Sequence, residues 1–121
     1  MDFLKIIKDM VHGVEGGLAG TVMGMDGIPI QSYAKDGAGI DTEALLVEYV
    51  GVLGEIKKAS EVLKLGETEE IIITLGRVRI VLRIMTGEYF AAFILSHDGN
   101  LGKARYYLKR AAAVAAVELA Q

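Results

Sequence analysis

The chain has 121 residues, of which 52% are hydrophobic, and a formal net charge of −3. One domain spanning residues 1–121 is expected, since a chain of this length can bury about two-thirds of the surface that it exposes when unfolded. The acidic balance argues against a nucleic-acid binder, no apolar run reaches the ~18 residues of a membrane helix, and the lack of cysteine excludes disulfides and thiolate metal sites.

The first element is predicted to be an amphipathic helix. Its apolar residues recur at spacings of three and four, which places them on one face; they are Phe3, Ile6, Ile7, Met10, Val11 and Val14. Asp2 is the expected N-cap, and Gly16-Gly17 is the expected end. Charged residues interrupt this apolar segment, so we expect no signal peptide and a cytoplasmic protein.

A β-hairpin is predicted next. Residues 18–23 and 28–34 can form strands joined by a turn at Met25-Asp26-Gly27, because Asp-Gly is a favoured hairpin dipeptide. The second strand contains the only proline of the chain, Pro29. Proline cannot donate to a sheet ladder, so this strand is expected at a sheet edge.

The longest predicted element is a helix over residues 41–66, with Asp41 as its N-cap and Gly66 as the glycine that ends it. One face is expected to be buried, and it consists of Leu45, Tyr49, Val52, Leu53, Ile56, Ser60 and Leu63. A second row lies roughly opposite and consists of Val47, Val50, Gly51, Gly54, Lys58, Glu61 and Leu65.

The two glycines of the second row need a physical reason, because a glycine inside a helix costs about 1 kcal/mol relative to alanine. Close approach of another helix is one such reason. The alternative is that Gly51 and Gly54 are poorly packed positions without a partner. We expect the former, with this row at a dimer interface.

Three strands are predicted after the long helix, over residues 70–75, 78–85 and 89–95. The last is apolar on both faces, so it is expected at the centre of the sheet with helices on both sides. The first contains Ile71, Ile72 and Ile73, and no proline, lysine or glycine among them disfavours pairing with another strand. It is expected at the second sheet edge. Pairing with the same strand of a second copy would cover this edge by a two-fold operation.

A final helix is predicted to begin after Asn100, its N-cap. Its expected buried stripe consists of Leu101, Ala104, Leu108, Ala111, Ala112, Ala115 and Leu119. Residues 71–121 hold 3 acidic and 7 basic residues, whereas residues 1–70 hold 13 acidic and 6 basic ones. Such asymmetry favours recognition of a partner, or of a second copy, in one orientation.

No catalytic chemistry is predicted. Ser96-His97-Asp98 are consecutive, whereas the members of a catalytic triad meet through the fold, so we interpret them as a turn. His12 is interpreted as a partly exposed helix residue, and two histidines are too few for a histidine metal site. Residues 99–104 lack the spacing of a phosphate-binding loop. We therefore predict no enzyme activity, metal, cofactor or small-molecule substrate.

Four segments carry a family resemblance: residues 25–30, the helix from Asp41, residues 77–80, and Asn100-Leu101-Gly102-Lys103-Ala104-Arg105, which is the most specific. Over essentially the whole chain, this αββαβββα pattern resembles the roadblock family of dynein light chains and its bacterial and archaeal relatives. The resemblance implies an α+β, profilin-like fold with a five-stranded antiparallel sheet. It places the long helix on one face of the sheet and the two terminal helices on the other.

The resemblance also implies a homodimer, in which the long helices pack side by side and the strands after them continue the sheet. It further implies a non-enzymatic signalling role as a regulator or scaffold of a small Ras-like GTPase, of the GTPase-activating or the polarity and motility-control type. The alternatives are a dynein-type structural adaptor and a PAS-like or profilin-like small-molecule sensor. The apolar strands offer few polar residues to line the pocket that a sensor needs.

Two sets of residues follow from these expectations. The expected dimer interface consists of Val47, Val50, Gly51, Gly54, Lys58, Glu61, Ile71, Ile72 and Ile73. The expected partner-binding residues are Val47, Lys57, Lys58, Glu61 and Lys64.

Overall fold

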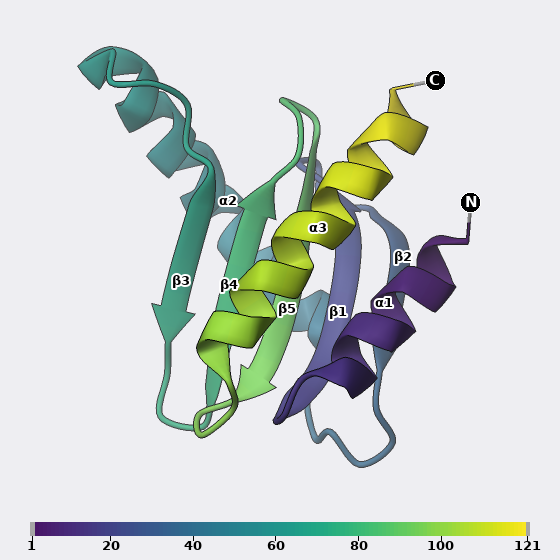
Figure 1. Ribbon diagram of the computed structural model, residues 1–121. Helices are drawn as coiled ribbons and strands as arrows, with labels where there is room; N and C mark the ends of the chain where they lie inside the picture. Colours follow the sequence, from purple (N-terminus) through teal and green to yellow (C-terminus); the bar gives the residue numbers. More distant parts are fainter. Residues whose placement is uncertain (1, 121) are drawn as a thin grey trace.

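The computed structural model describes residues 2–120, and its elements follow the predicted order. Figure 1 shows three helices and one five-stranded sheet. The elements are α1 (Phe3–Gly13), β1 (Gly17–Gly24), β2 (Pro29–Ala34), α2 (Thr42–Leu63), β3 (Glu70–Thr74), β4 (Val78–Ile84), β5 (Tyr89–Ser96) and α3 (Leu101–Leu119).

The strands form a sheet in the order β2-β1-β5-β4-β3, and all neighbours are antiparallel. The predictions that β5 is central and that β2 and β3 form the two edges are therefore confirmed. Pro29 is the first residue of β2, where its missing N–H group is tolerated. The register between β1 and β2 shifts beside it, between Val22 and Met23.

The sheet has a hydrophobic core on each face. α2 covers one face, and α1 and α3 lie side by side over the other, as Figure 1 shows. Strand residues alternate between the two cores: Phe90 packs on the α2 side and Phe93 on the α1/α3 side, and both are buried. This two-sided burial explains why β5 is apolar throughout, and it confirms the expected layer arrangement.

The first helix ends earlier than expected. α1 begins after Asp2, whose carboxylate accepts a hydrogen bond from the Lys5 N–H group, and ends at Gly13 instead of Gly16-Gly17. Gly16 lies in the turn that follows, with a φ of 82°. Gly17 already belongs to β1, and a side chain there would collide with the carbonyl oxygen of Val11. These glycines therefore allow the close passage from helix to strand.

The packing face of α2 differs from the predicted one. Leu46 and Leu53 are its fully buried apolar residues, and Leu46 was missing from the expected face. Val52 and Leu63, which were expected to be buried, are exposed. The face is rotated because Leu46 and Leu53, seven residues apart, lie on one line along the helix and face the sheet. The other four members of the predicted face, Leu45, Tyr49, Ile56 and Ser60, are half-buried.

The C-terminal end of α2 was also predicted wrongly. The helix ends at Leu63, because Lys64 adopts a left-handed conformation with a φ of 54° and donates its N–H group to the Ser60 carbonyl. Leu65 and Gly66 therefore lie outside the helix. Gly66 does have a positive φ, of 109°, but it shapes the loop that leads to β3.

The last helix is capped and packed as predicted. The Asn100 side chain accepts a hydrogen bond from the Lys103 N–H group at 3.1 Å. The members of the expected stripe that are fully buried are Ala104, Leu108, Ala112 and Ala115.

Replacement of the cap, Asn100→Ala, is expected to lower the free energy of unfolding by about 1 kcal/mol, because an amide of the first turn loses its acceptor. Urea denaturation would measure the change, with Asn100→Asp as a control that keeps a capping oxygen. A denaturation midpoint equal to that of the wild type for Asn100→Ala would contradict this account of the helix start.

Candidate interaction surface

A row that contains two glycines runs along one side of α2. We call it the glycine flank, and it consists of Val47, Val50, Gly51, Gly54, Lys58 and Glu61. Val50 and Gly54 are half-buried, and the other four are exposed. A Cβ atom added at Gly51 or Gly54 would meet no described atom within 4 Å. The fold of one chain therefore does not require glycine at either position, although each glycine weakens the helix by about 1 kcal/mol. A reason for these glycines has to be sought outside the single chain.

The C-terminal end of α2 extends beyond the sheet. Figure 1 shows its last turns projecting past β3 at the upper left of the view. Apolar side chains are exposed there: Val62 is 80% and Leu65 is 87% exposed, and Leu63 is also exposed. Exposed apolar residues clustered at the end of one element commonly mark a contact surface.

The edge of β3 lies below this projecting end. β3 hydrogen-bonds to β4, and no described strand lies on its other side. Ile71 and Ile73 are half-buried against the core on the α2 side, whereas Ile72 points to the opposite face and is 39% exposed. The edge therefore presents open backbone groups together with apolar side chains, which favours the addition of another strand.

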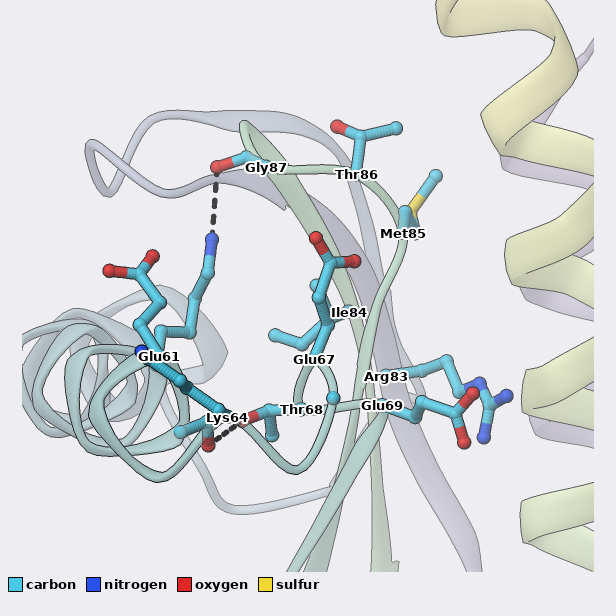
Figure 2. A pocket seen from close by; sticks show the side chains of 13 residues that line it. Glu61, Lys64, Glu67, Thr68, Glu69, Arg83, Ile84, Met85, Thr86 and Gly87 are labelled. Atoms are coloured by element: carbon cyan, nitrogen blue, oxygen red, sulfur yellow. Dashed lines mark hydrogen bonds between the residues drawn. The ribbon is translucent and has the colours of Figure 1, made fainter.

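A cleft of about 720 Å³ separates the end of α2 from the turn between β4 and β5 (Figure 2). Two hydrogen bonds fix its walls. The Lys57 ammonium group donates to the Gly87 carbonyl at 3.2 Å, and the hydroxyls of Ser60 and Thr68 lie 2.7 Å apart. Charged residues of both signs line the cleft: Lys57, Lys64 and Arg83, and Glu61, Glu67 and Glu69. Such a lining suits a polar protein surface better than an apolar small molecule.

The structure brings together only part of the predicted partner-binding set. Lys57, Glu61 and Lys64 line the cleft, whereas Val47 and Lys58 lie outside it. Lys58 is exposed and lies 3.7 Å from Glu55 on the same helix. Sequence reasoning missed the cleft because its second wall comes from the β4–β5 turn, about thirty residues away in the chain. No local sequence pattern reports such a contact.

The side chains considered for catalysis lie as expected. Ser96 ends β5, His97 and Asp98 form the turn after it, and the ring of His97 lies 3.7 Å from the Asp98 carboxylate. His12 is exposed on α1, and its Nε2 lies 2.6 Å from the Tyr33 hydroxyl. Within residues 2–120, no three histidine or carboxylate side chains meet as metal ligands, and no helix is long and apolar enough to cross a membrane.

The fold defines the class of protein. A Roadblock/LC7 domain from Streptomyces avermitilis has the same fold, with a TM-score of 0.83 and 11% identity over 100% of both chains. The gliding protein MglB from Thermus thermophilus also has it, with a TM-score of 0.83 and 13% identity over 94% of this chain and 85% of MglB. These identities are low, and the likeness shows the fold alone.

A third comparison shows the family. MglC from Myxococcus xanthus is 37% identical to this chain, with a TM-score of 0.70, over 98% of this chain and 99% of MglC. The chain therefore belongs to the roadblock/LC7 family, and the expected family is confirmed. No protein-family model and no curated protein sequence matches it.

Proposed function

We propose that the chain forms a homodimer in the cytoplasm and that this dimer regulates or scaffolds a small Ras-like GTPase without catalysing a reaction of its own. The observation that carries the proposal is that the projecting, apolar end of α2 lies next to the open edge of β3 (Figure 1). The glycine flank adds to it, because the fold of one chain does not require its two glycines. The likeness to MglC and to the gliding protein MglB supports the motility-control type of regulator.

One two-fold operation would cover the edge of β3 and the projecting end of α2. If the β3 strands of two copies pair, the sheet continues beneath the projecting end of α2. The exposed Val62, Leu63 and Leu65 would then lie over the second copy, and the two α2 helices would approach each other. Gly51 and Gly54 leave room for that approach. A symmetric interface of this kind uses the same patch on both copies.

The charges near α2 bear on how the dimer acts on a GTPase. No arginine lies between Asp41 and Gly66; Lys57, Lys58 and Lys64 are the cations there. The arginines lie elsewhere: Arg77 in the β3–β4 turn, Arg79 and Arg83 on β4, and Arg105 and Arg110 on α3. Lysine is a poor substitute for the planar guanidinium of an arginine finger. If hydrolysis is accelerated, the paired helices therefore act by positioning the catalytic groups of the GTPase.

A GTPase that binds across the two-fold axis contacts both α2 helices, so we expect one GTPase per dimer. The experiment uses a Ras-like GTPase from the same genome, loaded with a GTP analogue, and measures stoichiometry by sedimentation. Lys64→Glu is expected to weaken the complex, because Lys64 is exposed in the cleft and lies outside the glycine flank. Absence of any complex with the wild-type dimer, or a complex unaffected by Lys64→Glu, would contradict the proposed binding surface.

Single-turnover GTP hydrolysis at saturating dimer tests the mechanism. We expect the single alanine replacements of Arg77, Arg79, Arg83, Arg105 and Arg110 to leave the hydrolysis rate of the complex within a few-fold of the wild type. A donated arginine finger contributes roughly a thousandfold or more. A loss of that size in one variant, with binding intact, would show that an arginine is donated and would overturn the positioning mechanism.

A further inference from the structure

The outer face of α3 carries a second periodic row that the packing of the fold does not use. The helix buries Ala104, Leu108, Ala112 and Ala115 against the sheet and α1. On its opposite side, Lys103, Tyr106, Arg110, Ala113 and Val117 follow one another at spacings of three, four, three and four residues. We call this row the outer seam. Its spacing is that of the a and d positions of a coiled coil, which lie along one line of a helix and meet a partner helix.

The side chains of the outer seam are exposed and partly apolar. Tyr106 is 58% and Val117 is 62% exposed, and Val114 beside them is also exposed. The guanidinium carbon of Arg110 lies 5.6 Å from the centre of the Tyr106 ring, so the cation is held over the aromatic face. Ala113 follows and leaves space for a side chain of another helix. The row thus combines anchoring side chains with a small position between them.

The charge of α3 is strongly one-sided. Its basic residues are Lys103, Arg105, Lys109 and Arg110, and its acidic residue is Glu118 near the end. Arg105 is paired with the Glu70 carboxylate at 2.8 Å, whereas no carboxylate among residues 2–120 forms an ion pair with the other three. Lys103 lies in the first turn of α3, where the helix dipole disfavours positive charge, so helix stability does not account for a base there.

We propose that the outer seam docks an acidic amphipathic helix of another protein. From Lys103 to Val117 the seam runs about 21 Å, at 1.5 Å per residue, which matches about four turns of a partner helix. Apolar residues of the partner would pack on Tyr106 and Val117, and its flanking carboxylates would pair with Lys103, Lys109 and Arg110. The seam is narrow and offers Tyr106 and Val117 as its large apolar side chains, which fits a partner helix better than a lipid surface, because membrane-bound helices use a broad apolar face.

This surface goes beyond the proposed GTPase function, because it lies on the face of the sheet opposite α2 (Figure 1). A helix on α3 would leave α2 and the β3 edge free. The same molecule could therefore hold a GTPase on one face and a second protein on the other, which would make it a bridge between the two. Docking on α3 does not require the GTPase, so an experiment can contradict the docking proposal without contradicting the GTPase proposal, and the reverse.

The test uses a fluorescein-labelled peptide of about three heptads with Leu and Ala at a and d and Glu at e and g. Fluorescence anisotropy with the full chain is expected to show binding that weakens as salt is added. A matched peptide with Lys at e and g is expected not to bind. Arg110→Glu and Tyr106→Ala are each expected to weaken binding of the acidic peptide by roughly tenfold or more, since they reverse a charge and remove an anchor at the centre of the seam.

Lys35→Glu is the control, because it makes the same change of net charge in the loop after β2, away from α3. Circular dichroism checks that every variant is folded. Equal binding of both peptides, no binding of the acidic peptide, or an equal loss in Lys35→Glu and Arg110→Glu would overturn the proposal. So would stronger binding to phosphatidylserine vesicles than to the peptide with the same dependence on Arg110, which would assign the seam to a membrane surface.

Discussion

Gly54→Phe is expected to convert the dimer into a folded monomer. Within one chain the Cβ atom of the new side chain has room, because no described atom lies within 4 Å of its position. Replacing glycine should even strengthen the isolated helix by a few tenths of a kcal/mol. Against a second α2, however, a phenyl ring fills the space that two closely packed helices need. The substitution therefore separates the stability of the fold from the stability of the dimer.

Sedimentation velocity over a range of concentrations measures the outcome, and thermal unfolding of the variant measures the stability of the monomer. Ser60→Ala is the matched control on the same helix. It removes a hydroxyl that contacts Thr68 and the Ile56 carbonyl, both within the chain, so the dimer should persist. If Gly54→Phe sediments as an unchanged dimer, helix packing through the glycine flank is wrong. The two glycines would then be the poorly packed positions of the alternative interpretation.

The sequence predicted most of the fold, because its signals are local and agree with one another. Asp2, Asp41 and Asn100 each cap the helix that follows, and each accepts the expected backbone hydrogen bond. Pro29 marked one sheet edge, and the apolar run of β5 marked the centre. In every case a few consecutive residues determine the outcome, so no knowledge of the tertiary structure was needed.

The packing face of α2 was harder to predict because the helix is apolar on more than one side. Val52 and Leu46 fit a helical period almost equally well, and only the position of the sheet decides which one is buried. The exposed Val52, Val62 and Leu63 explain the ambiguity, since apolar residues outside the core of the single chain add hydrophobic signal to the wrong side of the helix. The left-handed conformation of Lys64 could not be predicted from its residue type, because a residue in this conformation at a helix end is usually glycine or asparagine.

The same distinction between local and long-range features applies to the candidate interaction surface. The glycine flank and the β3 edge could be predicted, because each is contained in one segment of sequence. The cleft could not, because Lys57 and Ser60 meet Thr68 and Gly87 only after β3, β4 and β5 have paired. The outer seam of α3 is a local pattern that sequence reasoning could have found. The prediction for this helix rested on its buried stripe instead, because that stripe has the clearer hydrophobic period.

Ile73→Lys is expected to have the largest effect on assembly. Ile73 lies on the α2 side of the edge strand and packs against the core there. In a dimer paired through β3, this position lies at the interface between the two copies. A lysine there would place two charges, one from each copy, in an apolar interface, and burying an unpaired charge costs several kcal/mol. Monomeric or insoluble protein is therefore expected by size-exclusion chromatography with light scattering.

Ile72→Lys provides the comparison, because it makes the same chemical change one residue away. Its side chain points to the other face and is 39% exposed, so the lysine can keep its ammonium group in water. We expect a weakened but detectable dimer for this variant. The side-chain period of a strand is two, so adjacent positions test opposite faces of the same edge. Soluble dimers like the wild type from both variants would argue that β3 does not pair across a two-fold axis, and would leave the glycine flank to account for dimerisation alone.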